Sequence, residues 1–525
     1  MYKDGKIWVA NNDKGENIFL LPKMANRHGL VAGATGTGKT ITLKVLAESF
    51  SDMGVPVFLA DVKGDLSGMV KEGADSEDMQ KRIKKFGLEE AGFDYQKYPA
   101  TFWDVFGENG IPLRTTISEM GPLLLARILG LNDLQSDILS ITFKIADDND
   151  LLLIDTKDLK SMLNYVSEHN KDFAESYGNI SKVSIAAIVR AIVALEMAGG
   201  DKFFFEPALN IKDWFTTGDG GKGMINILDS TSLINNGKLY ATFLLWMMSE
   251  LFENLPEVGD LDKPKMVFFF DEAHLLFDDA PKLLMDKIEQ VVKLIRSKGV
   301  GIYFVTQNPR DIPDGVLAQL GNKIQHALHA YTPSDMKAVK AAADSFRENP
   351  EFKTVDVIQE LGTGEAICSF LIEDGTPSVC EKVKILPPQS LMGSIDASTR
   401  EKEIRQSVLY SKYYEPEDPD SAYEFLQRMG IEEAEAAAKA AEEAANAKLK
   451  EKEEAAAAKA KEKEEAAAAR KKKQTAKTIG NSVVGTVGRE VGKSVGGKFG
   501  KFGKTLGGNL GASLGRGILS TLFKL

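Results

Sequence analysis

Short apolar runs alternate with stretches of helical spacing over the first 430 residues of the chain. The runs are too short for buried helices, and they predict the central strands of a parallel sheet. Strands and helices that follow one another in this way are typical of an α/β fold. The predicted strands lie at residues 29–32, 55–60, 223–228, 266–270 and 299–305.

A long helical stretch separates the second of these strands from the third. Between residues 115 and 205, apolar residues recur three or four positions apart, as Ile185, Ile188 and Ile192 do. That period is the spacing of one helix face. We therefore expect an all-α subdomain inserted into the sheet.

The composition changes after about residue 430. From Ala440 the sequence repeats every eleven residues and consists largely of alanine, glutamate and lysine, which all favour helix. An eleven-residue period is compatible with a slightly right-handed coiled coil, but alanine offers little area to bury. We therefore interpret this segment as a solvated helical spacer.

The final residues pair a glycine with almost every apolar residue, at a spacing of three or four. A helix of this pattern is amphipathic, with a glycine stripe beside its aliphatic face, but each interior glycine costs about 1 kcal/mol relative to alanine. Such a helix therefore needs a partner surface that stabilises it by packing closely against the glycine stripe. Three interpretations stay open: self-association or docking on a helical partner, binding to a membrane surface, and disorder with nucleic-acid contact.

These changes in pattern divide the chain into five predicted segments. A nucleotide-binding core is split by the helical insertion, and the spacer and the Gly-rich tail follow it. The segments are the first part of the core (1–114), the insertion (115–205), the second part of the core (206–430), the Ala/Glu/Lys spacer (431–474) and the tail (475–525).

Charge separates the tail from the body of the protein. The formal net charge is −11, yet from Arg470 onward twelve lysines or arginines stand against one acid, Glu490. The basic tail favours an anionic partner, whereas the acidic body does not itself favour DNA. Only two cysteines are present, with no signal peptide and no apolar stretch long enough to cross a bilayer. These features predict a cytoplasmic protein, with attachment to the membrane surface left open.

A glycine-rich octet follows the first predicted strand. Residues 33–40 read Gly-Ala-Thr-Gly-Thr-Gly-Lys-Thr. The glycines let backbone N–H groups turn inward around a polyphosphate, because a Cβ atom would block close approach or forbid positive φ. Lys39 can then reach the β- and γ-phosphates of ATP, the Thr40 hydroxyl can bind Mg²⁺, and the next helix points its positive end at the anion. The predicted ATP-binding residues are Gly33, Thr35, Gly36, Thr37, Gly38, Lys39, Thr40 and Ile41.

Two carboxylates, Asp271 and Glu272, follow the predicted strand at 266–270. Open α/β sheets bind ligands at the carboxyl ends of their strands. Asp271 is suited to help hold Mg²⁺. Glu272 is suited to act as the general base that deprotonates the water attacking the γ-phosphate. The plainer alternative is an acidic turn in which one of the two caps a helix. Together with the octet at 33–40, the nucleotide interpretation is favoured.

The strand at 299–305 also ends in polar residues, Thr306 and Gln307. At this position a side-chain amide can contact the γ-phosphate or the attacking water, so both residues are candidates. Before the strand, Arg296 closes an amphipathic helix. Arg296 has either a catalytic role or the plainer role of a cation at a helix C-terminus, and the pattern leaves both open.

These motifs resemble the HerA/FtsK superfamily of ring-forming ATPases, and in particular a HerA-like family of bacterial ATPases. The resemblance rests on the octet at 33–40, the strand end at 271–274 and the stretch 296–309. Further matching pieces lie at 60–68, 102–107, 121–127 and 325–328.

The resemblance implies a RecA-like P-loop NTPase core that assembles as a homo-oligomer, a hexamer, with ATP at the subunit interfaces. It also implies that Arg296 is supplied to the site of the neighbouring subunit, where it stabilises charge on the transferring phosphoryl group. DNA as a partner is implied by the resemblance alone.

Two functions are compatible with the sequence. The first is a Mg²⁺-dependent ATP hydrolase that converts hydrolysis into movement of a polymer, DNA, through a ring. The second is a nucleotide-gated assembly or membrane-docking module that hydrolyses ATP slowly as a switch. The catalytic candidates are Glu272, Gln307 and Arg296.

Overall fold

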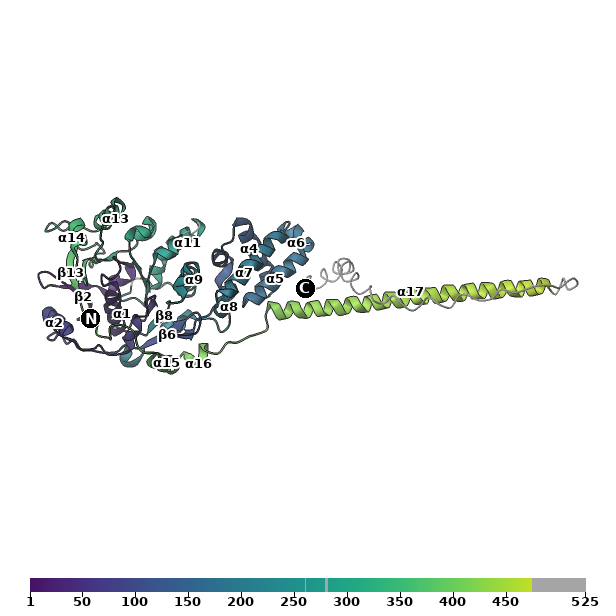
Figure 1. Cartoon of the computed structure of the whole chain (residues 1–525), viewed down its shortest axis with the longest axis horizontal. Helices are drawn as coiled ribbons and strands as arrows, with labels where there is room; N and C mark the ends of the chain where they lie inside the picture. The colour runs from purple at the N-terminus through teal and green to yellow at the C-terminus, as the bar shows by residue number, and fades with distance from the viewer. Residues whose placement is uncertain (260, 279–281, 475–525) are drawn as a thin grey trace. The chain divides into compact units, whose positions relative to one another are not determined.

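The computed structural model describes residues 1–259, 261–278 and 282–474. This part of the chain divides into two compact units, whose elements are labelled in Figure 1. Among the described residues, the first unit contains Met1–Glu168 and Ile180–Ala422, and the second contains His169–Asn179 and residues 423–474.

One large sheet organises the first unit. Within the described residues it contains thirteen strands, in the order β1-β2-β13-β12-β11-β4-β10-β9-β5-β8-β6-β7, with β3 beside β2. Their bounds are β1 Tyr2–Lys3, β2 Lys6–Asn12, β3 Asn17–Leu20, β4 Gly29–Ala32, β5 Val57–Asp61, β6 Ala100–Asp104, β7 Ile111–Pro112, β8 Ile225–Asp229, β9 Met266–Phe270, β10 Val300–Thr306, β11 Asn322–Gln325, β12 Glu365–Ser369 and β13 Glu381–Ile385.

The middle of this sheet is parallel and buried. β10 pairs with β4 on one side and with β9 on the other, and β5 pairs with β9. Every residue of β4, β5, β9 and β10 is buried, as expected for strands that are covered on both faces. These are the strands that the apolar runs predict. The edge formed by β12, β13 and β2 is antiparallel instead.

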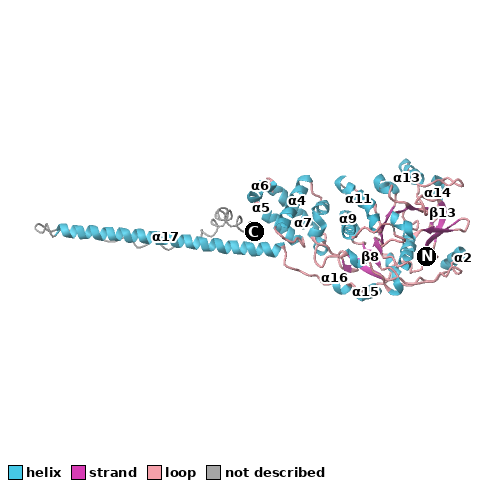
Figure 2. Cartoon of the chain, turned by 180° about the vertical axis from the view of Figure 1, so that it is seen from behind, coloured by secondary structure: helices cyan, strands magenta, loops and turns pink. Residues whose placement is uncertain are grey.

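Helices flank the sheet, as the cyan ribbons of Figure 2 show. One of them, α1, begins at Lys39, within the last two residues of the glycine-rich octet, so its N-terminus faces the carboxyl edge of β4. Outside the insertion, the helices of the first unit are α1 Lys39–Asp52, α2 Glu77–Phe86, α9 Gly237–Asn254, α10 His274–Phe277, α11 Lys282–Ile295, α12 Asp314–Leu317, α13 Pro333–Asp344, α14 Thr354–Glu360, α15 Ala397–Gln406 and α16 Tyr410–Tyr413.

Between β7 and β8 the described chain is helical. In α7 the predicted apolar face is buried, through Ile185, Ile188 and Ile192 among others. The helices are α3 Ile117–Leu129, α4 Asp133–Asp148, α5 Thr156–Glu168, α6 Asn170–Tyr177, α7 Lys182–Met197 and α8 Gly200–Phe203, and α6 belongs to the second unit. The predicted α/β P-loop core with an inserted all-α subdomain is thus confirmed, whereas the numbered segment boundaries stay predictions.

The segment after β13, residues 386–396, packs against α1, and we call it the C-terminal strap. The buried carboxylate of Glu48 accepts hydrogen bonds from the backbone of Gln389 and Ser390 and from the Ser390 hydroxyl. One turn earlier on α1, the buried Lys44 ammonium group donates to the carbonyl of Leu391. Two buried charges of α1 therefore hold the strap through hydrogen bonds, which is how buried charges are tolerated.

The second unit contains α6 and the long helix α17, Ala422–Gln474. The side chains of α17 that the structure describes between residues 431 and 454 are almost all exposed. This agrees with the interpretation of the segment as a solvated helix. The tail at 475–525 lies outside the described residues. Among the helices that the structure describes, none combines the length and the apolar character that crossing a bilayer requires.

Candidate functional site

The glycine-rich octet forms a tight loop between β4 and α1. Gly36 and Gly38 have φ values of +80° and +112°, which glycine adopts at little cost. A Cβ atom at Gly33 would lie 2.5 Å from the Cβ atom of His326, so the loop also needs a residue without a side chain there. Lys39 bends back over the loop, and its ammonium group donates to the carbonyls of Gly33 (2.6 Å) and Ala34 (3.2 Å).

The threonines of the loop occupy different positions. Thr37 is buried, and its hydroxyl donates to the Ala34 carbonyl at 2.7 Å. Thr35 is exposed, whereas Thr40 and Ile41 lie half-buried in the first turn of α1. Backbone N–H groups at a helix start and a threonine hydroxyl are a suitable environment for a phosphate and its Mg²⁺. The loop therefore has the geometry of a phosphate-binding loop.

His326 supports the loop from behind, a role that the sequence did not predict. Its Nδ1 donates to the Glu365 carbonyl at 2.9 Å, because a carbonyl can only accept, and its Nε2 then accepts from the Thr42 hydroxyl at 2.9 Å. Next to this contact, Gly364 N–H donates to the Thr37 carbonyl at 2.9 Å. Residues that are distant in sequence thus clamp the loop.

Asp271 and Glu272 follow β9 at the same edge of the sheet. Asp271 Oδ1 accepts the backbone N–H of Glu272 at 2.9 Å, and the Tyr240 hydroxyl donates to the Asp271 carbonyl at 2.7 Å. Burial of the carboxyl group, and then the charge of Glu272, raise the pKa of Asp271 to about 6, although the residue retains some exposed surface. The positive charge of Lys39 lowers the pKa of Asp271, so the phosphate-binding loop and the carboxylate pair interact electrostatically.

Glu272 has a φ of +48°, which is rare for a residue with a side chain. Such a conformation costs about 1–3 kcal/mol and persists only where the surroundings impose it. In this conformation both Glu272 oxygens lie 3.4 Å from the Gln307 amide nitrogen, and one lies 3.3 Å from His274 Nδ1, which is not a geometrically good hydrogen bond. The structure therefore brings the proposed base close to the amide that is predicted to contact the γ-phosphate or the attacking water.

Thr306, the other candidate for contact with the γ-phosphate or the attacking water, lies in a different environment from Gln307. It is buried, and its hydroxyl lies 3.4 Å from the carbonyl of Asn308 in the following turn. Its side chain therefore serves the turn, and Gln307 is the polar residue of this strand end that reaches Glu272.

Arg296 is not brought to this site within the same chain. It lies between α11 and the start of β10, where its charge affects His28. Burial lowers the pKa of His28 to about 4, and the positive charge of Arg296 contributes to that shift. Gln307 follows the other end of β10, a strand of seven residues, which is about 20 Å long at the usual rise. Both interpretations of Arg296 thus stay open.

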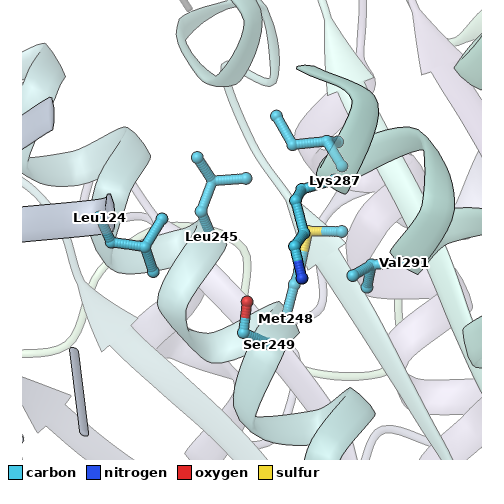
Figure 3. Close-up of a pocket in the computed structure, with 7 residues that line it drawn as sticks. Leu124, Leu245, Met248, Ser249, Lys287 and Val291 are labelled. Atoms are coloured by element: carbon cyan, nitrogen blue, oxygen red, sulfur yellow. The ribbon is translucent and has the colours of Figure 1, made fainter. Parts of the chain in front are cut away.

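A separate small cavity lies among α3, α9 and α11, and none of its lining residues belongs to the phosphate-binding loop (Figure 3). Its volume is about 20 Å³, which suffices for roughly one water molecule. It therefore offers no room for a nucleotide. Its lining residues are Leu124, Leu245, Met248, Ser249, Lys287, Ile288 and Val291.

A phosphate-binding loop at the centre of a parallel sheet, with a carboxylate pair at a nearby strand end, defines a P-loop nucleoside triphosphatase. The chain belongs to the helicase HerA-like C-terminal family, whose model matches residues 6–511.

Similar proteins include the DNA double-strand break repair helicase HerA of Sulfolobus acidocaldarius, which is 23% identical over 371 residues, 67% of this chain and 64% of that protein. The protein of the same name from Saccharolobus solfataricus is 24% identical over 376 residues, 70% of this chain and 66% of that protein. The chain thus spans less than two thirds of these relatives. Among solved structures, the plasmid coupling protein TrwB with the non-hydrolysable GTP analogue GDPNP has a TM-score of 0.49 and 16% identity, covering 72% of this chain and 89% of TrwB.

The clamp formed by His326 predicts a pH effect. Burial lowers the pKa of His326 to about 4 from the ordinary value of 6.5, so the folded protein holds this ring neutral while the unfolded chain protonates it. The stability that the ring contributes is present above about pH 6.5 and is lost as the pH falls toward about 4. In His326→Asn, we therefore expect the loss of melting temperature relative to the unmodified protein to be smaller at about pH 5 than at about pH 7.5.

Thermal melts of the two proteins at both pH values provide the measurement. His329→Asn is the matched control, because His329 is exposed and lies three residues further along the chain. An equal loss at the two pH values would contradict the assignment of a neutral His326.

Proposed function

We propose that this chain is a ring-forming, Mg²⁺-dependent ATPase that couples ATP hydrolysis to the movement of DNA. The observation that carries the proposal is the group formed by Lys39, Asp271, Glu272 and Gln307 at the carboxyl edge of the sheet. A phosphate-binding lysine, a carboxylate pair and an amide in one place suit attack by water on a γ-phosphate.

In this proposal each side chain has one task. The loop N–H groups and Lys39 bind the β- and γ-phosphates. Glu272 takes a proton from the attacking water, and Gln307, whose amide lies 3.4 Å from the Glu272 oxygens, orients that water. Burial lowers the pKa of Lys39, while the charges of Asp271 and Glu272 raise it and favour the cation that a phosphate needs.

Thr40 and Asp271 suit Mg²⁺, because hydroxyl and carboxylate oxygens are the ligands that this ion prefers. Burial, and then the negative charge of Glu272, raise the pKa of Asp271, and a divalent cation bound there would relieve the repulsion between the two carboxylates. Bound there, Mg²⁺ would neutralise charge on the phosphate oxygens.

DNA as the polymer and the assembly into a ring are inferred from similarity to other proteins. The relatives described above are named DNA double-strand break repair helicases, which supports DNA as the polymer. In a ring, Arg296 would act in the site of the next subunit, which is compatible with its distance from the phosphate-binding loop of its own chain.

The basic, Gly-rich tail at 475–525 supports a second candidate function. In that case the chain is a nucleotide-gated module that assembles or docks on a membrane surface, and ATP hydrolysis resets it. The two functions differ in what accelerates turnover: DNA for a translocase, and lipid or self-assembly for a docking module.

The two functions are separated by ATPase rates measured with duplex DNA, with single-stranded DNA, with anionic vesicles and without any addition. For a translocase we expect either form of DNA to raise the rate several-fold and vesicles to leave it unchanged. The chain truncated before residue 475 is the control, since it should keep basal ATP binding. Stimulation by vesicles alone, lost on truncation, would favour the docking module.

Two substitutions separate ATP binding from hydrolysis. Lys39→Ala removes the cation that holds the β- and γ-phosphates, so ATP affinity should fall at least about tenfold. Glu272→Gln keeps the shape but removes the base, so ATP should still bind while kcat falls by about a hundredfold or more. Equilibrium binding and steady-state kinetics give both values. Nearly normal turnover of Glu272→Gln would exclude Glu272 as the base.

The role of Arg296 across a subunit boundary is tested by mixing inactive variants. Arg296→Ala subunits mixed with Lys39→Ala subunits should recover part of the ATPase activity, because an intact loop and an intact arginine then meet at some interfaces. Mixing Glu272→Gln with Lys39→Ala is the control, since both groups are needed within one chain. Mixed rings that stay as inactive as this control would leave Arg296 as a helix-terminal cation.

A further inference from the structure

The loop that follows β5, residues 62–65, lies beside the carboxylates of the site. β5 pairs in parallel with β9, with Leu59 opposite Phe269. Two residues further along both strands, Asp61 comes level with Asp271, and Lys63 lies just beyond that edge. Because neighbouring strands are only about 4.8 Å apart, the loop that carries Lys63 is the next one to the Asp271 turn.

The backbone of this loop is held at several points. The buried Asp61 carboxylate accepts the N–H of Leu66 at 3.1 Å, and the Ser67 hydroxyl donates to the Gly64 carbonyl at 3.1 Å. Gly64 turns the chain with a φ of +76°, and Gly68 packs so closely against the C-terminal strap that a Cβ atom would lie 2.3 Å from two of its carbonyl oxygens. The position of Lys63 is therefore fixed by residues on both sides of it.

The Lys63 side chain itself is exposed. Within the described part of the chain, its ammonium group makes neither a hydrogen bond nor an ion pair. Its charge nevertheless reaches both halves of the site. Burial is the main influence on both pKa values: it lowers the pKa of Lys39 and raises that of Asp271. The positive charge of Lys63 adds to the lowering at Lys39 and opposes the rise at Asp271. A fixed backbone thus carries a cation at the site whose side chain is available for a ligand.

We propose that Lys63 is a second cationic ligand of the γ-phosphate and that it makes the site prefer ATP to ADP. The inference rests on the proposed ATPase function and adds a binding residue to it. Lys39 approaches the phosphates from the loop between β4 and α1, whereas Lys63 approaches from the end of β5, on the far side of the Asp271 turn.

Electrostatics explains why a cation belongs there. The γ-phosphate has to lie near Glu272 for water to be activated between them, and two negative groups at that distance repel each other. A lysine on the carboxylate side of the phosphate reduces this repulsion without occupying the position of the water. ADP lacks the γ-phosphate, so its binding does not depend on that lysine.

Comparison of two nucleotides in the full-length protein tests the assignment. The probes are Mg²⁺ with ADP and Mg²⁺ with an ATP analogue whose β,γ-bridge is an imido group. In Lys63→Ala, the affinity for the analogue should fall about tenfold or more, while the affinity for ADP changes by less than about twofold. Lys63→Arg should retain most of the preference for the analogue, because it keeps the charge.

Lys97→Ala is the matched control. Lys97 is also exposed, but it precedes β6 and therefore lies at the opposite edge of the sheet. It should leave both affinities unchanged. Equal losses for ADP and for the analogue in Lys63→Ala, or no loss for either, would overturn the assignment of Lys63 while leaving the ATPase proposal intact. An unmodified protein that binds neither nucleotide would instead contradict the ATPase proposal itself.

Discussion

The burial of two adjacent carboxyl groups at one edge of the sheet is the constraint on which the site depends. Asp271 and Glu272 are adjacent, and the raised pKa of Asp271 records first the cost of burying its carboxylate and then the cost of holding it beside a second negative charge. The strained backbone conformation of Glu272 adds a further cost in free energy. The cations Lys39 and Lys63 act in the opposite direction and lower the pKa of Asp271. A polyphosphate bound beside these carboxylates adds further negative charge, which agrees with the proposed use of Mg²⁺.

The elements that the sequence predicts are those whose signal is local. The glycine-rich octet and the apolar runs at β4, β5, β9 and β10 each fit within a few residues, so both the phosphate-binding loop and the parallel core follow from the sequence. The His326 clamp and the Gly364 contact join residues about three hundred positions apart, and neither has a local pattern. The antiparallel edge of the sheet is equally non-local, because β13 pairs with β2 from the other end of the chain.

The helix α1 connects the site to the rest of the first unit. Its first turn contributes Lys39 and Thr40, while Lys44 and Glu48 on its body hold the C-terminal strap. Burial raises the pKa of Glu48, and three hydrogen bonds from the strap favour its ionised form. The same strap packs against Gly68, just after the loop that carries Lys63. The strap therefore contacts both the helix that follows the phosphate-binding loop and the segment just after the Lys63 loop.

The position of β10 gives a physical reason for hydrolysis to depend on assembly. This buried strand lies between β4 and β9, so it cannot shift without disturbing both the phosphate-binding loop and the carboxylate pair. Gln307 follows its carboxyl end and meets Glu272, while Arg296 precedes its other end. In the proposed ring, one rigid strand then contacts the nucleotide of its own subunit at one end and that of a neighbour at the other. In such a ring, a change at either nucleotide would be transmitted to the other through a strand with little freedom to absorb it, and adjacent sites would be coupled without any flexible connection.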